Sequence, residues 1–183
     1  MGRSRKSSIG KKINPTFFIF CEGKTEELYV KNLKSKYRIP LEIATKITKN
    51  NINETRINKF KKSKWTHKKD KTFLLYDIDA PKMLERLSAI KNAILLVSNP
   101  CIELWYLLHL KEQTASIDTK TCIKALEKAL NKKHDKTKLD SKVKELLDKG
   151  QLKAVNRARK LKAYNNPSST IYLLLDALNK VKK

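Results

Sequence analysis

Glycine and cysteine are both scarce in this sequence of 183 residues, which has four glycines and three cysteines. So few glycines leave no glycine-rich loop that could wrap around a nucleotide phosphate, and an NTP-hydrolysing motor would have to be supplied by another protein. The cysteines Cys21, Cys101 and Cys122 are odd in number and lack C-x-x-C spacing. They are expected to be buried, reduced thiols and not a disulfide framework or a zinc site.

Long apolar runs are absent as well. No stretch approaches the length that crosses a membrane, and the basic first residues are not followed by the apolar core of a signal peptide. The three histidines lack the supporting motifs of a Ser/His/Asp or Cys/His nucleophile. These observations predict a soluble, cytoplasmic protein without membrane contacts.

Acidic residues are few, because 18 Asp and Glu stand against 42 Lys and Arg, a net charge of +24. A surface of this kind binds polyanions, and nucleic acid is the leading candidate partner. The chain is also rich in Lys, Asn and Ile together, so a compositional bias could raise the lysine content without selection for binding. Such a bias does not explain why so few carboxylates balance the charge, and nucleic acid is therefore favoured.

Two apolar runs, each followed by acidic residues, organise the sequence. Residues 17–20 lead into Glu22, and residues 73–76 lead into Asp77 and Asp79. A near-continuous apolar run is typical of a strand buried on both faces of a parallel sheet, and ligands bind beyond the carboxyl ends of such strands. Mg²⁺ prefers carboxylate oxygens and needs only one or two of them beside a phosphate. The pattern indicates a magnesium site, with Glu22 as a further ligand or a general acid/base; acidic surface turns are the alternative.

Strand and helix patterns alternate over the first hundred residues and then give way to helical periodicity. The first helix is expected to have Thr25 as its N-cap, with Glu26 and Glu27 in its first turn. This order predicts an α/β class built from βαβ units. Residues 1–14 are expected to form a flexible basic arm, residues 15–112 an α/β core, and residues 113–183 a helical extension packed on that core.

Turn and cap signals subdivide the predicted extension. A helix over residues 139–149 is expected to stop at Gly150, and a further helix follows it. The last helix is expected to be capped by Ser168 or Ser169, after the break at Asn166-Pro167.

Four short motifs together resemble the RloB family. They are Glu22-Gly23-x-Thr25-Glu26-x-x-Tyr29, Asp77-x-Asp79, Ser98-Asn99-Pro100-Cys101-x-Glu103-Leu104-Trp105 with Leu108-His109, and Asn166-Pro167-Ser168-Ser169-Thr170. That family is placed in the toprim group, with topoisomerases, bacterial primases, some RNA maturases and OLD-type nucleases. The resemblance implies a toprim-like, four-stranded, largely parallel sheet flanked by helices. It also implies a setting near restriction or abortive-infection genes, sometimes beside an ATPase partner.

The acidic motif residues are the candidate catalytic set. The resemblance makes Glu22, Asp77 and Asp79 metal-binding and catalytic candidates, with Mg²⁺ or Mn²⁺ as the ion. Glu103 is a further catalytic candidate, because it is the one carboxylate in an otherwise apolar helix, where an unpaired charge is costly. It is expected either to pair with a Lys or Arg or to act as an accessory carboxylate. His109 is interpreted as a core or phosphate-contacting residue and not as a catalytic base.

Seven basic residues are candidate nucleic-acid contacts: Lys24, Lys61, Lys62, Lys64, Lys68, Lys69 and Arg157. Lys24 lies at a predicted helix N-terminus, where backbone N–H groups favour phosphate, and Arg157 could hold a phosphate through two hydrogen bonds. The lysines around Trp65 could combine phosphate contacts with base stacking. The alternatives are a solvated lysine, a structural salt bridge, and a solvated loop with Trp65 tucked into the core.

The sequence thus predicts a Mg²⁺-dependent nucleic-acid phosphodiesterase, with RNA such as tRNA favoured over DNA, that acts in anti-phage defence. Two alternatives remain open. One is a non-catalytic nucleic-acid-binding module, and the other is a regulatory subunit whose basic surface docks an acidic protein.

Overall fold

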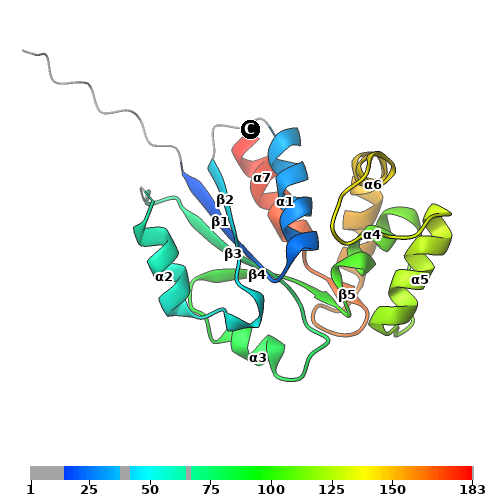
Figure 1. Ribbon diagram of the computed structural model, residues 1–183, viewed down its shortest axis with the longest axis horizontal. Helices are drawn as coiled ribbons and strands as arrows, with labels where there is room; N and C mark the ends of the chain where they lie inside the picture. The colour runs from blue at the N-terminus through cyan, green and yellow to red at the C-terminus, as the bar shows by residue number, and fades with distance from the viewer. Residues whose placement is uncertain (1–14, 38–41, 65–66, 183) are drawn as a thin grey trace, which may run out of the picture.

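The computed structural model describes residues 15–37, 42–64 and 67–182. At its centre lies a five-stranded sheet with the order β2-β1-β3-β4-β5 (Figure 1). The strands are β1 (Thr16–Cys21), β2 (Glu42–Ile47), β3 (Lys71–Asp77), β4 (Ala93–Asn99) and β5 (Ser168–Ser169). Strands β1 to β4 are parallel, and β5 is antiparallel to β4. The predicted α/β class with a largely parallel sheet is confirmed; the short fifth strand was not predicted. The predicted basic arm and Trp65 lie outside the described residues.

Seven α-helices and one 3₁₀ helix are found in the described ranges. They are α1 (Lys24–Lys36), η1 (Lys49–Asn51), α2 (Glu54–Lys62), α3 (Met83–Ser88), α4 (Ile102–Leu110), α5 (Thr119–Leu130), α6 (Ser141–Lys160) and α7 (Tyr172–Lys182). None of them is both long and apolar enough to cross a membrane.

Helices cover both faces of the sheet, which explains the apolar runs in its strands. Phe17 and Ile19 of β1 point to one face and pack in the core that includes α1 and α7. Phe18 and Phe20 point to the other face and pack with residues of α2 and α3. Figure 1 shows α1 and α7 on one side of the sheet and α2 and α3 on the other. Burying each such side chain contributes roughly 1.5–3 kcal/mol, so strand β1 is held from both sides. All three cysteines are buried and free, as predicted.

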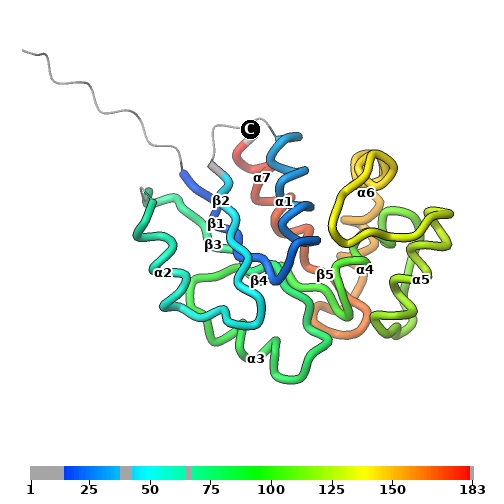
Figure 2. Tube along the Cα trace, in the orientation of Figure 1, coloured from blue at the N-terminus to red at the C-terminus, as the bar shows by residue number. Residues whose placement is uncertain are grey.

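The C-terminal segment returns to the sheet after α5 and α6 (Figure 2). Ser169 lies opposite Ser98 of β4, and the two hydroxyl oxygens are 3.0 Å apart. The Thr170 hydroxyl oxygen accepts a hydrogen bond from the Val97 N–H at 2.9 Å. The prediction that Ser168 or Ser169 caps the last helix is wrong, because these serines form β5 and α7 begins only at Tyr172.

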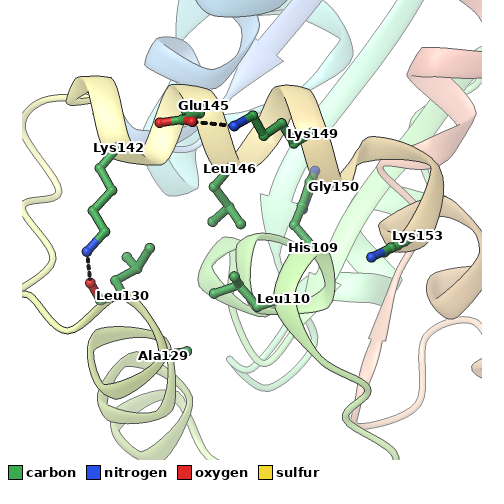
Figure 3. Close-up of a pocket in the computed structure, with 10 residues that line it drawn as sticks. All are labelled: His109, Leu110, Ala129, Leu130, Lys142, Glu145, Leu146, Lys149, Gly150 and Lys153. Atoms are coloured by element: carbon green, nitrogen blue, oxygen red, sulfur yellow. Dashed lines mark hydrogen bonds and ion pairs between the residues drawn. The ribbon is translucent and has the colours of Figure 1, made fainter.

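Gly150 does not stop a helix, so this prediction is wrong as well. Helix α6 runs without interruption from Ser141 to Lys160 and merges the two helices expected there. Gly150 lies where α6 crosses the end of α4 (Figure 3), and a Cβ atom at this position would lie 2.8 Å from both the Cβ and the carbonyl oxygen of His109. Close packing of two helices, and not a helix end, therefore requires glycine at this position.

Replacing Gly150 by alanine is expected to destabilise the protein. The added methyl group forces α6 away from His109, at a cost typical of overpacking, about 1–3 kcal/mol, whereas the gain in helix propensity is only about 1 kcal/mol. Urea unfolding should show a net loss of up to about 2 kcal/mol. The matched control is Leu152→Ala on the same helix, where the side chain is 73 % exposed and little change is expected. A more stable Gly150→Ala variant would contradict the packing explanation.

Candidate functional site

The carboxyl ends of β1 and β3, which are neighbouring strands, bring Glu22 and Asp77 together. The backbone N–H of Asp77 donates a hydrogen bond to Glu22 Oε2 at 3.0 Å. In the opposite sense, the N–H of Glu22 donates to the carbonyl oxygen of Leu75 at 3.0 Å. The Glu22 side chain is half-buried, and its pKa is raised by burial and by the charge of Asp79, against the lowering effects of the Asp77 N–H and of Lys136. A carboxyl with a raised pKa can hold or release a proton nearer to neutral pH.

Asp77 is the centre of the site. Its Oδ1 atom is buried and has no hydrogen-bond partner in the part of the chain that the structure describes. Its pKa is raised well above the usual range, first by burial and then by the charges of Glu26, Glu103, Glu22 and Asp79. Four further carboxylates thus act on one half-buried aspartate whose Oδ1 is buried, an arrangement that is unfavourable in itself and calls for a cation.

Asp79 lies at the open side of this cluster. It is exposed, and its Oδ2 accepts a hydrogen bond from the Thr119 hydroxyl at 2.8 Å. Thr119 is the first residue of α5, so the helical extension reaches the carboxyl end of the sheet. An open groove of about 650 Å³ lies at this point, lined by Asp79, Asn99, Asn166 and the start of α5.

Glu26 is a buried member of the cluster that the sequence reasoning placed only in the first turn of a helix. It is 5 % exposed, and its Oε2 accepts a hydrogen bond from the Gly23 N–H at 2.8 Å. Burial raises its pKa, and the charges of Glu22 and Glu103 add to this effect. Gly23 is the N-cap of α1, with Glu26 at the capping-box position, so the expectation that Thr25 caps the helix is wrong. The spacing of three residues between Gly23 and Glu26 is the signal that could have found this contact.

Glu103 is fully buried in the first turn of α4 and forms ion pairs. Lys136 Nζ lies 3.2 Å and His134 Nε2 3.4 Å from its Oε1 atom. No hydrogen bond to either Glu103 oxygen is found in the described ranges, so the contact with Lys136 is an attraction between opposite charges. Although burial alone would raise the pKa of Glu103, His134 and Lys136 lower it to about 2. The structure therefore shows the paired arrangement that was one of the two expectations for Glu103; its catalytic role stays a prediction.

Lys136 belongs to residues 131–140, between α5 and α6, and no sequence pattern singled it out. Its carbonyl oxygen accepts a hydrogen bond from the Thr25 hydroxyl at 3.1 Å, which joins this segment to the start of α1. The N–H of His134 donates to Glu127 Oε1 at 2.9 Å, and the His134 ring packs at right angles to Tyr106. The helical extension thus supplies a positioned cation to the carboxylate cluster.

The predicted basic contacts are not gathered at this site. Lys24 forms an ion pair with Glu27 at 2.9 Å, and Arg157 donates a hydrogen bond to the carbonyl oxygen of Leu108 at 2.7 Å. Lys61 donates to the Thr72 hydroxyl at 3.1 Å, near the start of β3. The exposed Lys62, Lys64, Lys68 and Lys69 lie between the end of α2 and the start of β3. Since β3 has seven residues, this cluster lies about 20 Å from the carboxylates at the other end of the strand.

His109 lies apart from the carboxylates as well, at the far end of α4. Its ring is buried, its Nδ1 donates to the carbonyl oxygen of Trp105 at 2.8 Å, and burial lowers its pKa to about 4. It lines a hollow of about 390 Å³ between α4, α5 and α6 (Figure 3). Two of the three lysines around this hollow are engaged, Lys142 with the carbonyl oxygen of Leu130 and Lys149 with Glu145. A neutral, buried His109 agrees with the interpretation of this histidine as a core residue.

The carboxylates fit a hydrated divalent cation better than a closed metal cage. In the described ranges, no three His, Cys, Asp or Glu side chains are arranged to hold a metal ion by themselves. Mg²⁺ usually retains several waters and takes only one or two protein carboxylates beside a phosphate. The partnerless Oδ1 of Asp77, with Glu22 and Asp79 beside it, provides such a donor set.

A protein-family model described as RloB-like protein matches residues 17–178, which include every acidic residue of the cluster. The chain belongs to the RloB-like family. No curated protein and no solved structure matches this RloB-like chain. The family therefore rests on the sequence match, and the geometry described above supplies the chemistry.

Proposed function

We propose that this RloB-like chain is a Mg²⁺-dependent phosphodiesterase that cleaves nucleic acid, with RNA such as tRNA as the preferred substrate class and Mn²⁺ as a possible substitute ion. The observation that carries this proposal is the buried, partnerless Oδ1 of Asp77 at the centre of four other carboxylates. A structural ion would not require a net charge of +24 on the chain, whereas a polyanionic substrate explains both features.

Each residue of the cluster has a distinct task in this proposal. Asp77 and Asp79 hold the ion, which when bound polarises a phosphodiester and favours formation of hydroxide. Glu22, whose Oε2 is oriented by the Asp77 N–H, accepts or donates a proton or completes the metal ligands. Glu103 holds Lys136 near Glu22 and Asp77, where its positive charge offsets part of the negative charge before substrate binds.

The family also supports a role in anti-phage defence, with an ATPase partner as the source of regulation. This part of the proposal rests on the resemblance and on the absence of a nucleotide-binding loop from the sequence.

The test is cleavage of total bacterial RNA, purified tRNA and plasmid DNA by the intact chain in Mg²⁺, Mn²⁺ or EDTA. We expect metal-dependent cutting, RNA before DNA, that is lost in an Asp77→Ala/Asp79→Ala variant. Cutting that persists in the variant would contradict the site. Binding without cutting in both proteins would favour the non-catalytic binding module, and the absence of both would favour the regulatory subunit.

A further inference from the structure

A basic groove lies between the edge strand β2 and helix α2, on the side of Glu22 away from Asp77. It has a volume of about 470 Å³ and is lined by Lys46, Ile47, Thr48, Arg56, Lys59, Phe60 and Ser63. The side chains of Lys46, Arg56 and Lys59 are exposed, and no ion pair found in the described ranges involves them. Three unneutralised cations therefore surround a hollow that contains no acidic residue.

The groove is joined rigidly to the carboxylate cluster. The N–H of Thr48 donates to the carbonyl oxygen of Cys21 at 3.0 Å, and the N–H of Lys49 donates to that of Glu22 at 3.1 Å. The Tyr76 hydroxyl contacts the Thr48 hydroxyl and donates to the carbonyl oxygen of Lys49 at 3.1 Å. Thr48, which lines the groove, is thus followed directly by the residue that is bonded to Glu22. These hydrogen bonds fix the wall of the groove to β1 and β3.

The direction of the chain explains why these basic residues, and not the lysine cluster predicted from the sequence, face the site. Helix α2 begins just after η1, whose first residue Lys49 is hydrogen-bonded to Glu22, and ends near the start of β3. Arg56 and Lys59 lie in its earlier turns, whereas Lys64, Lys68 and Lys69 follow its end.

We propose that this groove binds a single-stranded segment of the nucleic-acid substrate on one side of the scissile phosphate. Lys46, Arg56 and Lys59 contact successive phosphates, while Phe60 and Ile47 offer apolar surface for a base. The apolar surface favours a single strand, because the bases of a duplex stack on one another and are not free to contact Phe60 or Ile47. A strand lying in the groove leads its next phosphate to Glu22 and Asp77. The proposal rests on the proposed function for the identity of the polyanion, but its test does not depend on cleavage.

The experiment compares two triple variants of the intact chain. Lys46→Gln/Arg56→Gln/Lys59→Gln removes the groove charges, and Lys64→Gln/Lys68→Gln/Lys69→Gln removes the same charge from the segment between α2 and β3. Binding of a fluorescent single-stranded 12-mer RNA is measured by anisotropy in EDTA over a range of salt concentrations. Thermal unfolding confirms that both variants are folded, which is expected because all six side chains are exposed.

The groove variant is expected to bind the RNA about tenfold or more weakly. The plot of log K against log salt should become less steep by about 2, because each of three lost phosphate contacts contributes about 0.7 to the slope. The control variant should lose clearly less in both quantities. Equal losses would mean that net charge alone matters, and a larger loss in the control would assign binding to the predicted lysine cluster; either result overturns the groove. Unchanged binding in the groove variant overturns it as well.

The binding experiment tests the groove independently of the proposed phosphodiesterase activity. If the wild-type chain binds through the groove but cuts no substrate with any metal, the phosphodiesterase fails and the groove stands. If cutting depends on Asp77 but the groove variant binds and cuts like the wild type, the groove fails and the phosphodiesterase stands.

Discussion

Replacement of Asp77 by asparagine is expected to abolish metal-dependent cleavage and, at the same time, to make the folded protein more stable at neutral pH. A bound divalent ion contributes several kcal/mol to stabilising a phosphoryl transition state, and each 1.36 kcal/mol is a factor of ten in rate, so loss of its central ligand should lower activity about a thousandfold or more. The stability gain arises because Asp77 Oδ1 is buried without a partner among other carboxylates. Asparagine keeps the shape of this side chain but carries no charge among these carboxylates, so we expect a gain of about 1–3 kcal/mol at neutral pH.

The stability gain should depend on pH in a definite direction. Burial and the neighbouring carboxylates raise the pKa of Asp77 in the folded state, so between the unfolded pKa near 4 and the higher folded value the native state binds more protons than the unfolded state. The stability of the wild type therefore falls as pH rises through this window. Thermal unfolding from pH 4 to pH 8 should show Asp77→Asn and wild type close together at pH 4 and diverging above it.

The matched control is Asp148→Asn, which removes an exposed carboxylate that pairs with Lys36 on the surface. It should leave activity unchanged and alter stability by no more than about 0.5 kcal/mol. An Asp77→Asn variant that is both inactive and destabilised would indicate that Asp77 supports the fold and not a metal site.

Replacement of Lys136 by methionine is expected to destabilise the protein through Glu103. Glu103 is fully buried, and without the ammonium of Lys136 its charge keeps only the His134 ring as a neighbouring basic group. Breaking a fully buried ion pair costs about 3–5 kcal/mol, but the Lys136 side chain is 51 % exposed. Solvent screening therefore reduces the expected loss to about 1–2 kcal/mol, measured by urea unfolding at pH 7.

Two further variants separate this effect from a general loss of charge. Lys138→Met removes the neighbouring lysine, whose pair with Asp135 lies at the surface, and should cost at most about 0.5 kcal/mol. Adding Glu103→Gln to Lys136→Met removes the buried charge and should restore most of the lost stability, so the double-mutant cycle gives the coupling energy. Equal effects of Lys136→Met and Lys138→Met, or no rescue by Glu103→Gln, would contradict the pairing.

The contact between Glu103 and Lys136 also predicts how the stability of the protein changes at acidic pH. The pKa of Glu103 is about 2 in the folded protein, below its ordinary value of 4.5, so its stabilising contribution is present above pH 4.5 and is lost as pH falls towards 2. Lys136→Met removes one of the charges that lower this pKa. Between pH 4.5 and pH 2 the variant should therefore lose less stability on acidification than the wild type, and this part of its loss should end at a higher pH.

The sequence by itself determined the sheet and three of the carboxylates. Phe17, Phe18, Ile19 and Phe20 are apolar in succession, which only a strand covered on both faces can bury, and the same holds before Asp77. Strands with this pattern are parallel, so Glu22, Asp77 and Asp79 had to emerge at one edge of the sheet. These inferences depend on neighbours in the chain and on a general property of parallel sheets, and they needed no knowledge of distant contacts.

Only the tertiary structure decided what surrounds those carboxylates. Lys136 reaches Glu103 from a segment without periodicity. The place of this segment is set by the hydrogen bond from Thr25 of α1 to Lys136 and by the one from His134 to Glu127 of α5. Gly150 has the local signature of a helix end, but the close approach of His109 makes it an interior residue. The direction of α2 likewise places Arg56 and Lys59 in the groove lined by Thr48, next to the residue bonded to Glu22, and the predicted lysines near the start of β3. A sequence records which residues are basic or small, but the packing of distant segments decides which of them meet.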